Sequence, residues 1–436
     1  MISTKNATVH FGSNLDVLPT LEDNSVDSIV TDPPYELGFM GKSWDSSGIA
    51  YNVELWKECL RVLKPGGHLL SFGGTRTWHR VAVAIEDAGF EVRDSIAWMY
   101  GSGFPKSLDV SKAIDKAAGA EREKIPATGS LHKNKNLNDD SWSKIGEENP
   151  LMDSATPITL EAEKWEGWGT ALKPAFEPIV VARKPLIGTV AANVLEHSTG
   201  ALNIDGSRIG TEVLPEQKAG QAQIGTFERS EMVTPERKGR WPANVILDEY
   251  SAEILDEQSG ISTSKSGGKR TQTDNQTWQG GRFEAGKEFP RGGHNDSGGA
   301  SRFFYCAKAS KADRNEGLDD LEETTAAEMV DRKEGSAGID NPRAGAGRTS
   351  GAKNFHPTVK PTALMTYLIK LVTPPNGIVL DPFTGSGSTG KAAILEGFQF
   401  VGIELTEDYW PIIKGRLEHA ETQLTENKEK EGEQLF

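Results

Sequence analysis

A short run of chemically distinctive residues, Asp32-Pro33-Pro34-Tyr35, follows an apolar segment near the start of the chain. An aromatic amino group is a poor nucleophile because its lone pair is delocalised into the ring. Hydrogen bonds from such a group to the Asp32 carboxylate and to a prolyl carbonyl, whose direction proline fixes by locking φ, would draw its nitrogen toward tetrahedral geometry. Tyr35 offers a flat face for an extruded base, a contact worth about 1–3 kcal/mol in other base–aromatic stacks. The run predicts a site that activates an aromatic amino group.

A second run is rich in glycine and lies between a predicted buried strand and a predicted apolar helix. It reads Asp381-Pro382-Phe383-Thr384-Gly385-Ser386-Gly387-Ser388-Thr389-Gly390. Gly385, Gly387 and Gly390 have the GxGxxG spacing, and Glu404 stands 19 residues after Gly385 at the end of the next predicted strand. Glycines at such a turn let the backbone approach a ligand, and the acid can accept ribose hydroxyls. The run predicts a bound adenosine moiety.

Other interpretations of the two runs remain open. Either run could be purely structural, as an Asx-type turn or as a glycine turn that binds nothing. The glycine turn would also suit NAD, which makes an NAD-dependent oxidoreductase the rival enzyme. Asp381 weighs against NAD because its carboxylate would repel a pyrophosphate, whereas it suits the ammonium group of a methionine moiety. The occurrence of both runs in one chain favours a functional site.

Alternating strands and helices are predicted to position both runs. The expected strands cover 25–31, 68–72, 90–100, 377–380 and 398–403, and the expected helices cover 53–63, 78–88, 362–372, 388–396 and 407–417. This alternation predicts an α/β fold with a doubly wound sheet. Prolines end the strand before Asp32, so Asp32 and Asp381 both follow strands. Ligands bind at the carboxyl ends of strands in such sheets, and the two runs are expected to face one crevice.

The 436-residue chain divides by the strength of this periodicity. Residues 1–100 and 354–420 are expected to form one catalytic domain, and 421–436 an acidic tail. Residues 101–353, which separate the two parts of the catalytic domain, are expected to be an irregular insertion. Its stretches 259–301 and 334–353 are rich in Gly, Ser, Arg and Asn, which predicts that they lack a fixed conformation alone.

The composition limits the class of protein. A net charge of −15 argues against nucleic acid as a partner, because Lys and Arg supply most non-specific affinity for DNA, but 265–302 holds seven Lys/Arg against four Asp/Glu. Two cysteines, Cys59 and Cys306, are too few for a disulfide framework or a Cys-based zinc site, and the eight histidines lack HExxH spacing, so no bound metal is expected. No apolar run reaches the roughly 18 residues of a membrane span, and no leader is recognisable. A soluble cytoplasmic protein without membrane contact is expected.

The two runs together resemble the motifs of the amino-methylating DNA methyltransferases, the family of N6-adenine and N4-cytosine enzymes. The order, with Asp32-Pro33-Pro34-Tyr35 first and the glycine turn last, is similar to the permuted β group, in which the insertion carries target recognition. His356-Pro357-Thr358-Val359-Lys360-Pro361 is similar to the segment that helps to bind S-adenosylmethionine in that group. The resemblance covers about residues 7–100 and 354–420 and implies a mostly parallel, Rossmann-like methyltransferase sheet.

The resemblance assigns roles to individual residues. Asp32, Pro33, Pro34 and Tyr35 are the expected catalytic residues, and the expected residues for S-adenosylmethionine are His356, Lys360, Pro361, Asp381, Pro382, Phe383, Thr384, Gly385, Gly387 and Glu404. Lys360 is open between the methionine carboxylate and an ordinary place at a helix start. The family often reads Gly-Asp where this chain has Gly12-Ser13, so only a neutral partner such as Ser13 or Asn14 is expected near the cofactor adenine.

The resemblance also implies a substrate. Members with Asp-Pro-Pro-Tyr mostly methylate adenine, whereas Ser-Pro-Pro-Tyr is the commoner cytosine pattern, so methylation of N6 of adenine in double-stranded DNA is the expected activity. N4 of cytosine is the nearest alternative, and a catalytically silent DNA-binding protein is another. Neither cysteine follows a proline, which excludes 5-methylcytosine chemistry. A homodimer and a cognate restriction endonuclease are left open. Arg302-Phe303-Phe304-Tyr305 looks like a stretch of related, often phage-borne, methylases, implying a bacterial or phage-infected cell.

Overall fold

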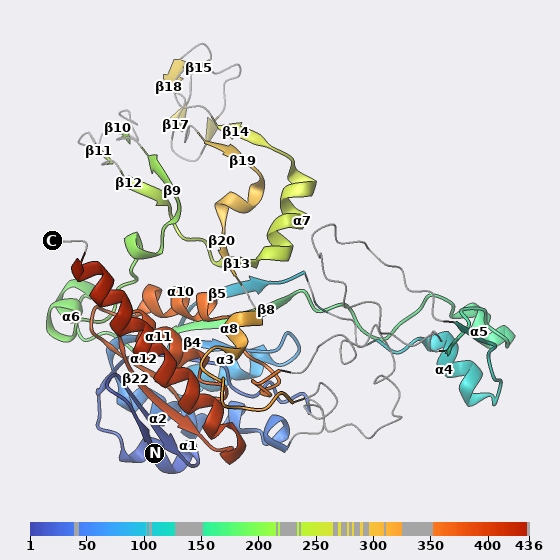
Figure 1. Cartoon of the computed structure of the whole chain (residues 1–436). Helices are drawn as coiled ribbons and strands as arrows, with labels where there is room; N and C mark the ends of the chain where they lie inside the picture. The colour runs from blue at the N-terminus through green and yellow to red at the C-terminus, as the bar shows by residue number, and fades with distance from the viewer. Residues whose placement is uncertain are drawn as a thin grey trace. The chain divides into compact units, whose positions relative to one another are not determined.

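A computed structural model of the chain divides into two compact units (Figure 1). The first comprises residues 1–101, 176–321 and 356–436, and the second comprises 102–175 and 322–355. The structure describes residues 1–38, 43–101, 103, 107–126, 151–214, 237–264, 296–308, 311–324 and 352–433, with short strand segments at 217–218, 233–234, 269–271, 277–278, 281–282 and 288–290. Across these residues, none of the helices is both long and apolar enough to cross a membrane.

A sheet to which ten of the described strands belong forms the centre of the first unit. Its order is β1 (Ile2–Ser3), β2 (Ala7–Phe11), β22 (Gln399–Glu404), β21 (Ile378–Asp381), β3 (Val26–Thr31), β4 (Leu63–Phe72), β8 (Phe176–Arg183), β5 (Glu91–Met99), β13 (Val245–Asp248) and β20 (Tyr305–Ala307). β1 runs antiparallel to β2, and β8 runs antiparallel to both of its neighbours; the other pairs are parallel. The predicted mostly parallel α/β sheet is confirmed.

Helices cover both faces of this sheet (Figure 1). α2 (Val53–Val62) and α3 (Trp78–Asp87) bury Leu55, Trp56 and Ile85 in one core cluster with β3 and β4. α11 (Ser388–Leu395) packs against both α10 (Thr362–Val372) and α12 (Trp410–Glu433), and α10 also contacts β3. The expected helices at 53–63, 78–88, 362–372 and 388–396 are therefore present, with ends that differ by at most one residue.

The division of the chain differs from the expected one. Residues 176–321 fall in the same unit as the Asp32 run and the glycine-rich turn, because β8, β13 and β20 are strands of the central sheet. The apolar run Ile179–Ala182 in β8 is buried between β4 and β5. The stretch 334–353 lies almost entirely outside the described residues, and the stretches 259–301 and 265–302 lie partly outside them.

The acidic segment expected as a tail continues a helix. α12 runs to Glu433, and its Glu421 carboxylate accepts hydrogen bonds from Thr4 Oγ1 at 2.7 Å, from the Asn6 main-chain nitrogen at 2.6 Å and from Asn6 Nδ2 at 2.7 Å. These bonds hold the middle of the helix to the chain between β1 and β2. Composition predicted a tail because it does not reveal contacts more than 400 residues apart, here |i−j| of 417 and 415.

The described part of the second unit contains a pair of short helices and a two-stranded antiparallel sheet. α4 (Val110–Ala117) packs against α5 (Leu160–Lys164), and β6 (Lys124–Pro126) pairs with β7 (Leu151–Asp153). A buried ion pair joins Arg122 Nε to Asp115 Oδ2 at 2.7 Å. This unit contains none of the residues to which the sequence assigned catalysis or cofactor binding.

Candidate active site

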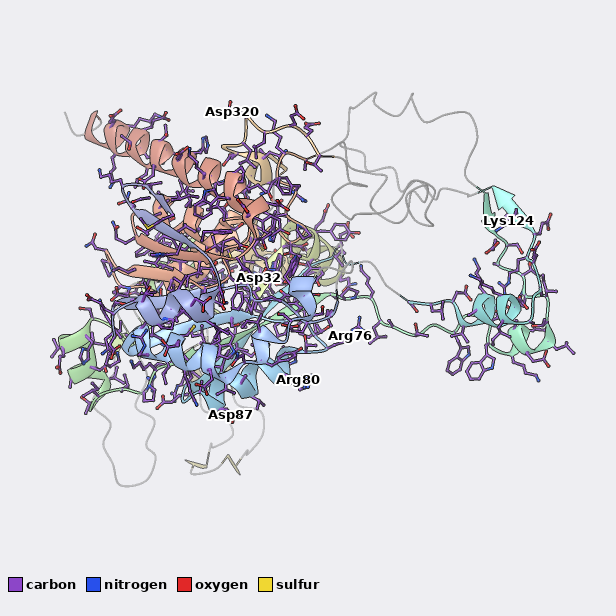
Figure 2. All side chains as sticks on the ribbon, turned by 90° about the horizontal axis from the view of Figure 1, so that it is seen from below. Asp32, Arg76, Arg80, Asp87, Lys124 and Asp320 are labelled. Atoms are coloured by element: carbon purple, nitrogen blue, oxygen red, sulfur yellow. The ribbon has the colours of Figure 1, made fainter. Side chains whose placement is uncertain are left out.

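The Asp32 run follows β3, and β21, the strand beside it, leads into the glycine-rich turn. β21 pairs with β3 through Val379↔Ser28 and Leu380↔Ile29. The Thr31 hydroxyl donates a hydrogen bond to Asp381 Oδ1 at 2.6 Å, so the residue before Asp32 is bonded to the first residue of the turn. Figure 2 marks Asp32 among the side chains of this unit. The structure therefore brings the two predicted runs together.

Four polar side chains form what we call the Asp32 cluster: Asp32, Tyr35, Glu177 and Lys360. The Lys360 ammonium lies 2.6 Å from Asp32 Oδ2, 3.2 Å from the Tyr35 hydroxyl and 3.3 Å from Glu177 Oε2. The Tyr35 hydroxyl donates a hydrogen bond to Glu177 Oε2 at 2.7 Å. The sequence left open a contact of Lys360 with the methionine carboxylate or an ordinary place at a helix start. In the structure its ammonium contacts the Asp32 run.

Burial and charge shift the pKa values in the Asp32 cluster. The pKa of Asp32 is raised, first because burial disfavours the carboxylate and then because of the Glu177 charge, against the opposing effect of Lys360. Burial works to lower the pKa of Lys360, but Asp32 and Glu177 outweigh it and raise that pKa. Burial and the same two carboxylates raise the pKa of Tyr35 well above its ordinary value. At neutral pH, Lys360 therefore stays an ammonium and Tyr35 keeps its proton.

One oxygen of Asp32 remains an available acceptor. Oδ2 is bonded to Lys360, whereas Oδ1 is buried and has no hydrogen-bond partner in the described part of the chain. An unpaired buried oxygen costs about 1–3 kcal/mol, so such an atom calls for a partner from outside the protein. Likewise, no described residue donates a hydrogen bond to the Pro33 carbonyl oxygen. These are the two acceptors that the predicted chemistry of an amino group requires.

The glycine turn has the geometry that its sequence predicts. Gly385 and Gly387 have φ of 53° and 74°, in the left-handed region that favours glycine. A Cβ on Gly385 would lie 2.9 Å from Nε2 of His356, so His356 packs directly on the turn. A Cβ on Gly390 would lie 2.7 Å from Phe400 of β22, so this glycine lets α11 approach the sheet closely.

Asp381 fastens the turn to its surroundings. Besides the bond from Thr31, its Oδ1 accepts one from the Phe383 main-chain nitrogen at 3.0 Å, and its Oδ2 accepts one from Thr389 Oγ1 at 2.6 Å. Burial raises the pKa of Asp381 to about 6 although these hydrogen bonds oppose the rise. Asp381 thus links the ends of β3 and β21 to the start of α11.

Glu404 holds the turn from the adjacent strand. Its Oε2 accepts a hydrogen bond from the Gly385 main-chain nitrogen at 2.7 Å, and its Oε1 accepts one from that of Thr406 at 2.7 Å. Burial raises the pKa of this carboxyl group. Since each carboxylate oxygen has two lone pairs, both oxygens can accept a further hydrogen bond from a ligand hydroxyl.

His356 lies beside the turn as a neutral ring. Burial lowers its pKa to about 3, and its Nδ1 accepts a hydrogen bond from the Thr358 main-chain nitrogen at 3.3 Å. The ring packs edge-on against Tyr409 with centroids 4.5 Å apart. A buried ring with so low a pKa packs and positions; it is unsuited to accept a proton at neutral pH.

The remaining residues that the sequence assigned to the cofactor lie in the same turn or at the start of α10. The Pro382 carbonyl oxygen accepts a hydrogen bond from Asn14 Nδ2 at 3.3 Å. Phe383 lies 6.5 Å from Trp56 between ring centroids, and Thr384 Oγ1 donates to the Asp381 carbonyl oxygen at 3.2 Å. Pro361 precedes α10 as its N-cap residue. Asn14 is one of the two neutral residues expected near the cofactor adenine, where the family often has an aspartate. It therefore contacts the turn.

The sequence did not predict Glu177 as a site residue. Nor did it predict a short helix, α8 (Lys311–Asn315), whose side chains bind the segments around the site. Asp313 of α8 accepts hydrogen bonds from the Thr362 main-chain nitrogen at 2.8 Å and from Lys391 Nζ at 2.7 Å. Arg314 donates to the His356 carbonyl oxygen at 3.0 Å. α8 thus connects the segment around His356 to α11. Neither Glu177 nor α8 lies in a motif, and only the charged residues of α8 could have drawn attention to it.

We expect Asp313→Ala to lower the free energy of unfolding by about 3 kcal/mol, the lower end for breaking a buried ion pair. The Lys391 side chain is 1% exposed and that of Asp313 is 18% exposed, so the variant leaves a buried ammonium with Glu316 as its remaining carboxylate partner. Urea unfolding followed by circular dichroism measures the change. The matched control is Glu418→Ala, which removes an exposed pair with Lys414 and should cost at most about 1 kcal/mol. Equal losses in both variants would contradict this role of α8.

Comparison with known proteins places the chain in a family. A family model described as a DNA methylase, of the N6/N4 type, matches residues 26–415. The chain therefore belongs to the amino-methylating DNA methylases, as its two runs predicted.

Individual relatives match shorter stretches. The type II methyltransferase M.ScaI of Streptomyces caespitosus is 47% identical over 79 residues, which are 18% of this chain and 26% of that protein. The type II methyltransferase M.HindIII of Haemophilus influenzae is 30% identical over 155 residues, 35% of this chain and 38% of that protein. The DNA adenine methyltransferase YhdJ of Escherichia coli is 46% identical over 65 residues, 15% of this chain and 22% of that protein. The matches thus span about a fifth to two fifths of these relatives.

Solved structures align over most of the chain at low similarity. The cytosine-N4-specific PvuII DNA methyltransferase has 13% identity and a TM-score of 0.41, covering 97% of this chain and 94% of that one. The M1.HpyAVI–SAM complex has 15% identity and a TM-score of 0.35, covering 94% of this chain and 100% of that one.

Proposed function

We propose that this chain transfers the methyl group of S-adenosylmethionine to N6 of adenine in double-stranded DNA. The observation that carries the proposal is the unpaired Asp32 Oδ1, set one residue from the Thr31–Asp381 hydrogen bond that joins the Asp32 run to the glycine turn. Membership of the DNA methylase family supports the class of reaction. The choice of adenine rests on the Asp-Pro-Pro-Tyr pattern.

The residues around the glycine turn fit S-adenosylmethionine, which supplies an electrophilic methyl group when bound. Gly385 and Gly387 allow close approach of the backbone, and the spare lone pairs of Glu404 suit the two ribose hydroxyls. The Asp381 carboxylate suits the methionine ammonium group.

The Asp32 run then acts on the target base. A base within a duplex is out of reach and must be flipped out of the stack, where the Tyr35 ring can pack on its face. Its amino group donates one hydrogen bond to Asp32 Oδ1 and one to the Pro33 carbonyl oxygen. As the nitrogen forms its bond to the methyl carbon, the sulfur keeps the electron pair of the broken C–S bond, and the positive charge passes to the nitrogen. The nitrogen finally releases one proton to water.

Two arginines beside the Asp32 run support DNA as the substrate of this acidic chain. The turn between β4 and α3 packs on the run: Thr77 Oγ1 donates to the Tyr35 carbonyl oxygen at 2.8 Å. Arg76 and Arg80 on this turn and helix are exposed (Figure 2). Neither forms an ion pair with a residue that the structure describes, and the Arg80 guanidinium lies 4.6 Å from the centre of the Tyr51 ring. Unpaired guanidinium groups at this place suit the phosphates that flank a flipped base.

The double variant Arg76→Ala/Arg80→Ala is expected to weaken DNA binding and to lower the slope of log Kd against log salt concentration by about 2, because each phosphate contact contributes about 0.9. Fluorescence anisotropy of a labelled duplex at several salt concentrations measures the slope. Lys57→Ala/Lys414→Ala removes the same charge at two exposed sites, where each lysine is already paired with a glutamate of its own helix. A slope that falls equally in both double variants would exclude specific phosphate contacts by Arg76 and Arg80.

Incorporation of a labelled methyl group tests the proposed function. The chain is incubated with labelled S-adenosylmethionine and unmethylated duplex DNA, and label in the DNA is counted for the wild type and for Asp32→Ala. Label that requires intact Asp32 supports the proposal. If the chain binds S-adenosylmethionine but labels no duplex of varied sequence, it is a catalytically silent binder or uses another acceptor, and the proposal is wrong.

A further inference from the structure

Glu177 reaches the Asp32 run because its strand is antiparallel to its neighbours. Ile179 of β8 pairs with Phe72, the last residue of β4, so Glu177 lies two residues beyond the carboxyl end of β4. The carboxyl ends of the parallel strands are where ligands bind in such sheets. The amino end of β8 therefore brings an acidic side chain to the same edge of the sheet as Asp32.

Glu177 makes two contacts within the Asp32 cluster. Its Oε2 accepts the hydrogen bond from the Tyr35 hydroxyl at 2.7 Å and lies 3.3 Å from the Lys360 ammonium. The exposed fractions of the Glu177 and Lys360 side chains are 19% and 7%. Tyr35 is thus held at both ends, at its hydroxyl by Glu177 and at its carbonyl oxygen by Thr77.

The second carboxylate changes the charge of the cluster. Lys360 lies 2.6 Å from Asp32 Oδ2, and with both carboxyl groups ionised the cluster carries one net negative charge. Without the Glu177 charge, Asp32 and Lys360 would be a neutral buried pair, and the ammonium would draw electron density from the carboxylate that has to accept the amino hydrogen bond. A net negative charge aimed at the amino nitrogen stabilises the positive charge that develops there during transfer.

We propose that Glu177 is a positioning residue for methyl transfer, which binds the Lys360 ammonium so that Asp32 keeps its strength as an acceptor and which fixes the Tyr35 ring against the target base. This inference rests on the proposed function. It assigns Lys360 to the same task and leaves cofactor binding to the glycine turn.

Glu177→Gln separates charge from shape, because glutamine has the same size and its amide oxygen can still accept from Tyr35. We expect kcat to fall by about 10- to 100-fold, while KM for S-adenosylmethionine changes by less than about 2-fold. The acid limb of the kcat–pH profile should move to lower pH, since the Glu177 charge raises the pKa of Asp32 and Lys360, then unopposed, lowers it. The titratable groups around Asp32 that stay in place are Lys360, Tyr35, Asp381 of β21, Tyr100 after β5 and His356.

Two further variants complete the experiment. Glu177→Asp restores the charge one methylene shorter and is expected to recover part of kcat and the position of the acid limb. Glu91→Gln on β5 removes a carboxylate that pairs with Arg183 in the same sheet, at 40% exposure, and should leave kcat and the profile unchanged. The variants and the wild type are compared in the same DNA methylation assay. Calorimetric titration of S-adenosylmethionine checks that each variant is folded.

The outcomes separate this inference from the proposed function. Wild-type kcat and pH profile in Glu177→Gln overturn the inference alone. The inference is also overturned if both Glu177 variants lose cofactor affinity as well as kcat, because Glu177 would then only maintain the fold. A wild-type chain that binds S-adenosylmethionine but methylates no DNA overturns the proposed function, and the inference with it.

Discussion

Replacing Asp32 by alanine is expected to reduce methyl transfer by about 10²- to 10⁴-fold and to leave the affinity for S-adenosylmethionine within about 2-fold of the wild type. The variant removes the unpaired Oδ1 that is proposed to accept from the amino group. It leaves Asp381 and Glu404 untouched, because the contact between the two runs is made by Thr31. Single-turnover transfer of labelled methyl and calorimetric titration of the cofactor measure the two effects separately.

The control for this variant is Asp87→Ala, an exposed carboxylate on α3 that lies in the same unit (Figure 2). It changes the net charge by the same amount and should have neither effect. Loss of cofactor affinity in Asp32→Ala would contradict the division of labour between the Asp32 run and the glycine turn. Retention of transfer would exclude Asp32 as the acceptor that orients the amino group.

Replacing Glu404 by alanine is expected to have the opposite pattern: weaker binding of S-adenosylmethionine by about 10- to 100-fold, with little change in kcat at saturating cofactor. The variant leaves the half-buried main-chain nitrogens of Gly385 and Thr406 without their acceptor, which loosens the turn. The ribose hydroxyls of the cofactor would lose their proposed acceptor as well. Calorimetric titration gives the affinity, and steady-state rates give KM and kcat.

Glu407→Ala is the matched control for Glu404→Ala. Glu407 lies in the 3₁₀ turn Glu407–Tyr409 just after β22 and is exposed. Its replacement should leave both the affinity and the rate unchanged. An unchanged cofactor affinity in Glu404→Ala would remove Glu404 from the proposed binding site, and a lost kcat at saturating cofactor would assign it to the chemistry instead.

The parts of the site that sequence predicted are those determined by neighbouring residues. Prolines that end a strand fix the place of Asp32, and the glycine spacing fixes the turn at Gly385 and Gly387, so the two runs were found from short patterns. Their meeting at one edge of the sheet followed from the rule for carboxyl ends of parallel strands.

The residues that sequence did not predict act over long separations. Tyr35 and Glu177 are 142 positions apart, and Lys360 and Asp32 are 328 apart. Glu177 is the second residue of β8, in a region of weak periodicity where the order β4-β8-β5 cannot be deduced from the chain. The role of Lys360 depends on which carboxylates surround it, and that is a property of the folded sheet.

The same reason explains where the predicted domain limits differ. Local patterns gave the helices α2, α3, α10 and α11 nearly residue by residue, but they could not show that β8, β13 and β20 leave the expected insertion and complete the sheet. Nor could composition show that the acidic residues after Glu418 continue α12 and bind Asn6.

Identification of the methylated nucleoside is the most direct test of the central claim. Duplex DNA methylated by the chain with labelled S-adenosylmethionine would be digested to nucleosides and separated by chromatography. The proposed function predicts label in N6-methyldeoxyadenosine, present with the wild type and missing with Asp32→Ala. Label in N4-methyldeoxycytidine would contradict the choice of base while preserving the mechanism, and label in neither nucleoside would contradict the proposed function itself.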